Sequence, residues 1–213
     1  KTNKKFVVND SIEGWSDAVG VLIASYFDQE ELFPEYVGKI VQFDYSKIRP
    51  AGAYLSSSSG KAPGPEPLKK ALTNIKRVLD KALKNCDFCA DELRSLSPIE
   101  AYDIVMHAAD AVISGGVRRS ATICVFSPDD KKMIKAKTGN WFRENPQRGR
   151  SNNSALLLRN KTSVKKFHEL MQSVREFGEP GFLWSDSTEL VVNPCVEIGM
   201  YPVDEKTKKT GWQ

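Results

Sequence analysis

Apolar residues recur every three to four positions in several stretches of the chain, which predicts amphipathic helices. The first stretch covers residues 12–27, IEGWSDAVGVLIASYF, and Asp10 followed by Glu13 predicts a capping box at its start. A second helix is marked by five core-facing positions: Leu68, Leu72, Ile75, Leu79 and Leu83. A third, in residues 97–114, opens with Ser97 as N-cap, Pro98 at the first helical position and Glu100 closing the box.

Short runs that contain β-branched, aromatic or other apolar residues lie between these helices and predict strands. They are VGKIVQFDY at 37–45, RRSATICVFS at 118–127, NNSALLLR at 152–159 and GFLW at 181–184. A short helix ending near Lys137 and a longer one over residues 163–178 separate the later strands. Strands alternate with helices along the whole length, so the predicted class is α/β.

Two polar segments interrupt this pattern. Residues 46–67 are dense in Gly, Ser and Pro, and they form either a flexible linker or a functional loop held at both ends. We favour the loop, because helix and strand continue beyond it without a change in composition. Residues 138–150, TGNWFRENPQRGR, predict a long polar loop. The 213 residues are interpreted as one partial domain, truncated at both ends, because the chain lacks an initial Met and stops at KKTGWQ.

Composition excludes several classes of protein. The chain is 40% hydrophobic and 27% charged, and it contains neither a transmembrane-length apolar run nor a signal-peptide core, so a membrane partner is not expected. Four scattered cysteines indicate a reducing, cytoplasmic location. The net charge is +4. The basic segment 145–153 could contact phosphates, but no continuous basic stripe indicates nucleic-acid binding.

Most thiols and imidazoles have a simple structural interpretation. Cys86 and Cys89 form a CxxC pair without further ligands at zinc spacing, and the pair follows a helix rather than a strand, so no metal or dithiol site is predicted. His107 and His168 lie in predicted helices and are interpreted as structural or solvated. Cys124 lies in an apolar strand and is expected to pack in the core.

Asn193, Cys195 and Glu197 differ from these residues because their spacing alternates. In an extended segment, positions two apart project to the same side, and Pro194 favours an extended Asn193. One face would then carry an amide, a thiol and a carboxylate. Without an adjacent His the thiol is not an obvious thiolate nucleophile. It could instead transfer a hydrogen atom as a radical, while the carboxylate moves a proton and the amide orients a hydroxyl.

The segment NPCVEI at 193–198 resembles the catalytic finger loop of ribonucleotide reductases. Five further motifs occur in the order found in the adenosylcobalamin-dependent, class II large chains of the ribonucleoside-triphosphate reductase type. They are DSIEGW at 10–15, FDYSKIRP at 43–50, GVRRSA at 116–121, RSNNS at 150–154 and GEPGF at 178–182. This resemblance implies about half of the ten-stranded α/β barrel, with the finger loop at 193–202.

The resemblance also implies catalytic roles. Cys195 corresponds to the thiyl-radical cysteine that abstracts the ribose 3′ hydrogen. Glu197 corresponds to the base for the 3′-hydroxyl proton, and Asn193 to the residue that binds the sugar hydroxyls. The implied activity is the reduction of ribonucleotides to deoxyribonucleotides, with adenosylcobalamin as the radical source and a thioredoxin-type protein as reductant.

Residues 10–65 and 138–150 correspond, by the same resemblance, to the specificity elements that bind a deoxynucleotide effector. Asp10 and Ser11 would hold the effector sugar at a helix N-terminus, and Lys47 and Arg49 would meet its phosphates. In the loop Thr138–Arg150, the residues implied to read effector or substrate bases are Asn145, Gln147 and Arg148.

Two alternatives stay open at this point. The chain could be a class I large chain, which takes its radical from a separate metal-bearing subunit. It could also be a catalytically inactive, nucleotide-binding half of a split reductase that needs the remaining half as a partner. The second alternative is motivated by cysteine positions, because neither residues 1–9 nor residues 197–213 contain the redox pair that the family uses.

Overall fold

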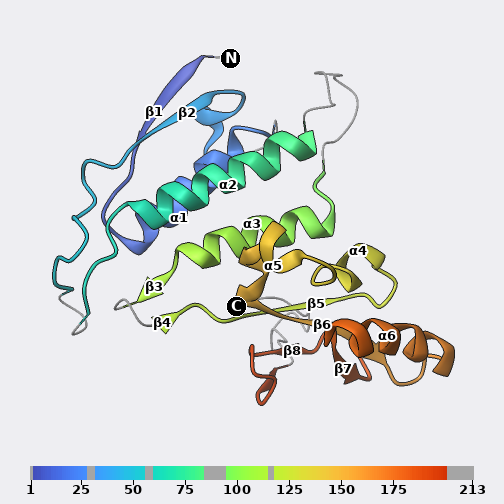
Figure 1. Cartoon of the computed structure of the whole chain (residues 1–213). Helices are drawn as coiled ribbons and strands as arrows, with labels where there is room; N and C mark the ends of the chain where they lie inside the picture. Colours follow the sequence, from blue (N-terminus) through green and yellow to red (C-terminus); the bar gives the residue numbers. More distant parts are fainter. Residues whose placement is uncertain (1, 28–31, 56–59, 84–94, 115–117, 201–213) are drawn as a thin grey trace, which may run out of the picture. The chain divides into compact units, whose positions relative to one another are not determined.

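The structure is a computed structural model that describes residues 2–27, 32–55, 60–83, 95–114 and 118–200 (Figure 1). It divides the chain into two compact units, residues 1–120 and residues 121–213. Each unit combines helices with parallel strands, so the predicted α/β class is confirmed. Cys86 and Cys89 lie outside the described residues, and their interpretation stays a prediction.

The first unit joins small two-stranded sheets to three helices. Its elements are β1 (Asn3–Val7), α1 (Ile12–Ala24), the 3₁₀ helix η1 (Pro34–Tyr36), β2 (Ile40–Asp44), α2 (Glu66–Leu83), α3 (Pro98–Ala111), β3 (Ile113–Ser114) and β4 (Arg118–Arg119). Strands β1 and β2 pair in parallel, and β3 and β4 pair antiparallel. Strand β1 was not predicted from the sequence.

Helix α2 supplies the centre of the first unit's core. All five of its predicted core positions are buried, and Ile75 and Leu79 are fully inaccessible. Helix α2 packs against α3, as Figure 1 shows, and α1 contributes the buried Ala18 and Leu22 to the same cluster. The predicted start of α3 is confirmed, since the Ser97 N–H donates to the Glu100 carboxylate at 2.8 Å.

The second unit is built on a three-stranded parallel sheet in the order β5–β6–β7. Its elements are β5 (Thr122–Phe126), α4 (Lys131–Ile134), α5 (Trp141–Glu144), the 3₁₀ helix η2 (Pro146–Arg150), β6 (Ser151–Leu158), α6 (Val164–Phe177), β7 (Gly181–Ser185), β8 (Val191–Val192) and β9 (Gly199–Met200). The predicted strand over 118–127 is interrupted, because β4 and β5 belong to different sheets.

Helix α6 connects β6 to β7, as a crossover between parallel strands requires. The Ser163 hydroxyl accepts a hydrogen bond from the Lys166 N–H at 3.2 Å and so caps the helix start. Gly178 ends the helix in the left-handed conformation, with φ of 72°. The Phe167 ring lies 5.1 Å from the Phe182 ring and 5.6 Å from the Trp184 ring, so aromatic contacts join the helix to β7.

Candidate functional site

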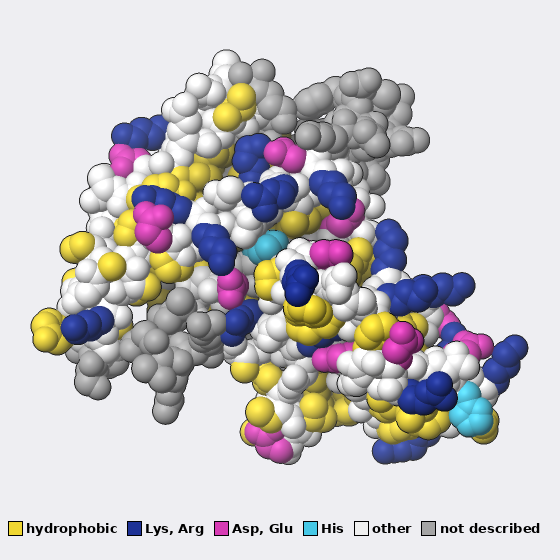
Figure 2. All heavy atoms as spheres, viewed as in Figure 1, with side chains coloured by type: hydrophobic (Ala, Val, Ile, Leu, Met, Phe, Trp, Pro, Cys, Tyr) yellow, Lys and Arg dark blue, Asp and Glu magenta, His cyan; other side chains and the backbone are white. Residues whose placement is uncertain are grey.

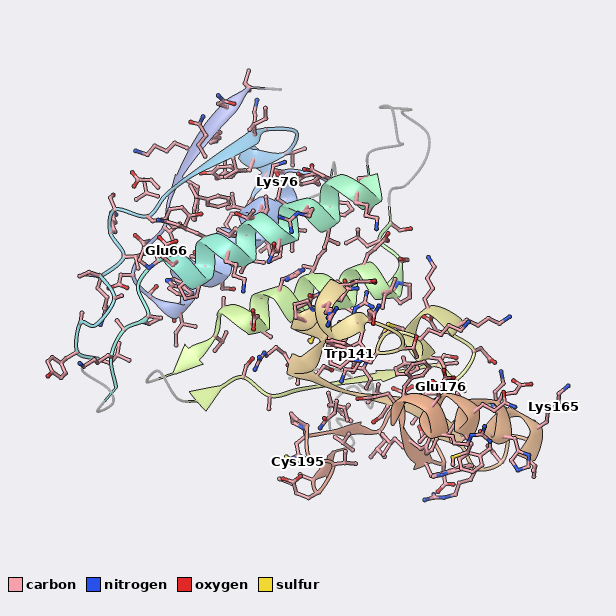
Figure 3. All side chains as sticks on the ribbon, in the orientation of Figure 1. Glu66, Lys76, Trp141, Lys165, Glu176 and Cys195 are labelled. Atoms are coloured by element: carbon pink, nitrogen blue, oxygen red, sulfur yellow. The ribbon has the colours of Figure 1, made fainter. Side chains whose placement is uncertain are left out.

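Residues 193–198 form the tip of a hairpin between β8 and β9 (Figure 3). The Asn193 N–H donates to the Ile198 carbonyl at 3.2 Å, and the Val196 N–H donates back to the Asn193 carbonyl at 2.9 Å. This closes a turn, and Val196 takes a φ of 67°. The predicted extended conformation of residues 193–197 is therefore wrong. The three candidate side chains come from one tight turn, and not from alternate positions of a strand.

The thiol of Cys195 and the carboxylate-bearing Glu197 are both exposed at this tip, whereas Asn193 is half-buried. The side chain of Asn193 supports the turn, since its Oδ1 accepts a hydrogen bond from the Ile198 N–H at 3.0 Å. A second anchor comes from β6, where Asn152 Nδ2 donates to the Pro194 carbonyl at 2.7 Å. The tip thus presents an accessible thiol and carboxylate on a turn fixed to the sheet.

The N-terminus of α1 gathers the four residues proposed to bind the effector sugar and phosphates. Ser11 is the N-cap, and its Oγ accepts a hydrogen bond from the Gly14 N–H at 3.0 Å. The predicted capping box of Asp10 and Glu13 is therefore wrong: the N-cap is Ser11, and the residue three positions later is Gly14, which has no side chain to close a box. Asp10 instead forms an ion pair with Arg49 at 2.5 Å. Lys47 Nζ donates to the Asn9 side chain at 3.3 Å, so the segment after β2 lies against the helix start through two side-chain contacts.

A cavity of about 580 Å³ opens beside these residues. Asp10, Ser11 and Arg49 supply polar groups to its wall, and Trp15 and Leu68 are among the apolar residues that line the rest. An apolar pocket of this size with a few convergent polar groups is typical of small-molecule sites. The N-terminus of α1 and the Arg49 guanidinium in the cavity wall favour an anionic ligand group there, although the Asp10 carboxylate already pairs with this guanidinium.

The described part of residues 46–67 also borders this cavity and behaves as a loop. The Gly52 N–H donates to the Ala62 carbonyl at 2.9 Å, and the Ala62 N–H donates to the Ala53 carbonyl at 2.7 Å. The two branches of the segment are thus tied together by backbone hydrogen bonds. These contacts favour the interpretation as a loop held at both ends over that of a flexible linker.

Residues 138–150 are more ordered than the predicted polar loop. They contain α5 and η2, and Gln147 is only 5% exposed. Gln147 Nε2 lies 3.5 Å from Asn145 Oδ1. Arg148 Nη1 donates to the Ala136 carbonyl at 2.7 Å. The three candidate base-reading residues therefore lie close together in one compact segment, and all three form hydrogen bonds within the second unit.

Sequence reasoning missed Lys137, which directly precedes residues 138–150, and its partner Glu179. Lys137 is 5% exposed, and its Nζ lies 3.0 Å from Glu179 Oε1. A fully buried lysine is rare in proteins unless it is paired. No sequence pattern indicated this pair, because the two residues are separated by 42 positions.

The pKa shifts of His107 and Cys124 agree with structural roles for these two residues. Burial lowers the pKa of His107 below its ordinary value, so the imidazole in α3 favours its neutral form. Burial also raises the pKa of Cys124 from 9.0 to about 11, which keeps this thiol protonated at neutral pH. Cys124 on β5 is half-buried, so the predicted packing in the core is only partial.

Charged side chains of both signs are interspersed on the face shown in Figure 2. In the described parts of the chain, no group of three or more His, Cys, Asp or Glu residues is arranged to hold a metal ion. Among the described helices, none combines the length and the apolar character needed to cross a bilayer.

Comparison with known proteins connects these features to one family. Residues 2–79 match the family described as the insertion domain of B12-dependent ribonucleotide reductase. The chain is 32% identical over 174 residues to the adenosylcobalamin-dependent ribonucleoside-triphosphate reductase of Lactobacillus delbrueckii subsp. bulgaricus, covering 82% of this chain and 21% of that protein. It is 26% identical over 212 residues to the enzyme of the same name from Euglena gracilis, covering 91% of this chain and 26% of that protein.

A crystal structure of a B12-dependent, class II ribonucleotide reductase shares the fold, with a TM-score of 0.66 and 27% sequence identity. The match covers 88% of this chain and 23% of that one. In sequence and in fold the chain thus resembles ribonucleotide reductases. More particularly, the similarity is to the adenosylcobalamin-dependent, class II type, which confirms the resemblance seen in the sequence motifs. The chain spans about a fifth to a quarter of the length of these relatives.

Proposed function

We propose that the complete polypeptide carrying this chain reduces ribonucleotides to deoxyribonucleotides, with Cys195 as the residue that becomes a thiyl radical. The observation that carries this proposal is the exposed Cys195 thiol on an anchored turn, between Asn193 and Glu197, in a chain related to class II reductases. The relatives named above are adenosylcobalamin-dependent or class II enzymes, which favours this type over the class I alternative.

When bound, adenosylcobalamin would supply a carbon-centred radical, and the accessible thiol of Cys195 is suited to give up its hydrogen atom and so become the thiyl radical. The Cys195 radical then takes the 3′ hydrogen atom of the ribose, which restores the thiol and leaves a carbon-centred radical on the sugar. Glu197 accepts the 3′-hydroxyl proton, and Asn193 hydrogen-bonds the sugar hydroxyls. The 2′-hydroxyl would leave as water, and the two electrons and the proton that replace it would come from a cysteine pair elsewhere in the polypeptide, which becomes a disulfide and is reduced again by a thioredoxin-type protein.

We further propose that a deoxynucleotide effector binds at the start of α1. Its phosphates would meet Lys47 and Arg49, and its sugar would lie near Asp10 and Ser11, beside the apolar cavity. The position of the Arg49 guanidinium at a helix N-terminus supports this assignment, because an anion is favoured there; a phosphate would share or replace its ion pair with Asp10. Residues 138–150 then select the substrate base, with Gln147 as the principal candidate.

The proposal is tested with Cys195→Ser in the complete reductase. A serine hydroxyl fills similar space but does not readily form the hydrogen-abstracting radical, so we expect deoxynucleotide formation to fall below about one thousandth of the wild-type rate, a typical loss for an essential catalytic group. Effector affinity, measured by calorimetry, should stay unchanged. Cys124→Ser is the matched control and should retain turnover. Activity of Cys195→Ser within tenfold of the wild type would remove this residue from the radical role.

A further inference from the structure

A single buried ammonium group lies between the two ends of the segment 138–150. Lys137 directly precedes this segment, and Ser151 directly follows it. Lys137 Nζ donates to the Ser151 carbonyl, so one side chain connects the residues on either side of thirteen intervening positions. Both residues are buried, with 5% and 4% of their surface exposed.

The same ammonium reaches a third element. Glu179, two residues before β7, accepts from Lys137 Nζ at 3.0 Å, and its backbone carbonyl accepts from the Ser173 hydroxyl of α6 at 2.9 Å. The carboxylate is therefore held at the junction of α6 and β7. Lys137 links this junction to Ser151 at the start of β6. Both ends of the segment 138–150 are therefore attached to the three-stranded sheet.

Two contacts extend this arrangement into the segment itself. Lys137 Nζ lies 5.7 Å from the centre of the Trp141 ring, within reach of a cation–π interaction. Arg148 Nη1 donates to the Ala136 carbonyl at 2.7 Å, next to Lys137 in the chain. The lysine is thus surrounded by a carbonyl, a carboxylate and an aromatic face, which suits an ammonium with three donors.

We infer that Lys137 is a positioning residue for substrate selection, which sets the shape of residues 138–150 by joining their two ends to Glu179. This inference rests on the proposed role of the segment in choosing the substrate base. Burial of a lysine is costly, and an apolar side chain of the same length would fill the space without that cost. The charge fixes one geometry, because the buried ammonium must keep its acceptors, whereas apolar packing would permit several.

The test uses Lys137→Met and Lys137→Arg in the complete reductase. The measurement is the ratio of deoxynucleotide products from four competing ribonucleotides, with each effector in turn. Methionine keeps the length without the charge, so the effector-dependent product ratio should change by about fivefold or more, the lower range of allosteric coupling. Lys137→Arg, which preserves the charge, should restore much of the wild-type ratio. A lysine with only a structural role would lower all four rates together and leave the ratio unchanged.

Glu179→Gln keeps the shape of its side chain and removes the negative charge, and it should shift the ratio in the same direction. This variant decides the matter if Lys137→Met does not fold. The rate of trypsin cleavage at Arg143, in α5, gives a readout independent of activity. This rate should rise in Lys137→Met and in Glu179→Gln, because the ends of the segment are no longer joined.

Gln147→Ala separates the inference from the proposal on which it rests. If Gln147→Ala leaves every product ratio unchanged, the segment does not select the base, and the proposed function of residues 138–150 fails. If Gln147→Ala shifts the ratios while the variants of Lys137 and Glu179 do not, the segment selects the base but the lysine does not position it. The inference about Lys137 is then overturned by itself.

Discussion

The close approach of Gly14 to the backbone of Asn9 allows a sharp test of the proposed effector site. Gly14 is buried in the first turn of α1. A Cβ atom added there would lie 2.4 Å from the Asn9 carbonyl oxygen and 2.9 Å from its carbonyl carbon. Ordinary van der Waals separation is about 3.5 Å, so the backbone of Asn9 would have to move by roughly 1 Å in Gly14→Ala. That backbone leads directly into Asp10.

Two opposite effects set the stability of Gly14→Ala. Alanine is favoured over glycine inside a helix by about 1 kcal/mol. Overpacking of a tight site costs about 1–3 kcal/mol, and the upper part of this range applies because the neighbour is backbone rather than a flexible side chain. The clash should therefore exceed the helix preference, and we expect a net loss of about 1–2 kcal/mol. For a chain of this length, such a loss lowers the melting temperature by roughly 2–8 °C.

Gly20→Ala is the matched control, because it lies in the same helix and also has a close neighbour. Its added Cβ would lie 2.7 Å from Cε2 of Phe33, an aromatic side chain that can rotate. Thermal unfolding of both variants should show a smaller loss, or a gain, for Gly20→Ala. Calorimetry should show weaker deoxynucleotide binding to the complete reductase carrying Gly14→Ala. Equal melting temperatures for Gly14→Ala and wild type would refute the argument that the close approach of Gly14 to the Asn9 backbone shapes the start of α1.

Two further outcomes follow from charge and burial. Arg49→Ala should change the free energy of unfolding by less than about 1 kcal/mol, because its pair with Asp10 is partly exposed. Arg49→Ala should weaken effector binding by about tenfold or more, because a charged hydrogen bond is lost. The control Arg77→Ala, at an exposed position, should bind the effector as wild type does. Equal effector affinities of Arg49→Ala and wild type in calorimetry would contradict the phosphate assignment. Cys124, whose pKa is raised to about 11, stabilises the fold below pH 9 and loses this contribution as pH rises toward 11, because the unfolded thiol ionises first. In denaturant titrations, the free energy of unfolding should therefore fall less between pH 9 and pH 11 in Cys124→Ala than in wild type. The same dependence of this free energy on pH in both proteins would show that burial of the thiol does not affect stability.

Helical periodicity was sufficient to predict the longest elements. The apolar positions of α2 recur at a strict spacing, and local caps define α3, so both helices follow from information within a few residues. Strand β1 lacks such information: its sequence NKKFV carries two lysines and is partly exposed on both faces. It is a strand because it pairs with β2, whose residues lie more than thirty positions away. A pairing of this kind has no local signature in the sequence.

The same distinction explains two of the three corrections at the candidate sites, the cap of α1 and the conformation of residues 138–150. Asp10 and Ser11 are both good N-caps, and the long-range ion pair with Arg49 decides which of them caps α1. In residues 138–150, the Gly, Asn and Pro content indicated a loop, but contacts of Arg148 and Lys137 with residues outside the segment give it a compact helical form. In each case a distant partner selects between two locally acceptable conformations.

The turn at 193–198 raises a question about how Asn193 could serve both structure and chemistry. Val196 is a β-branched residue with φ of 67°, an arrangement that costs about 1–3 kcal/mol. The contacts of Asn193 Oδ1 with the Ile198 N–H and of Asn152 with the Pro194 carbonyl offset this cost. Because the turn uses only the oxygen of the Asn193 amide, its Nδ2 retains donors for a ribose hydroxyl. One side chain can therefore hold the turn that presents Cys195 and also orient the sugar.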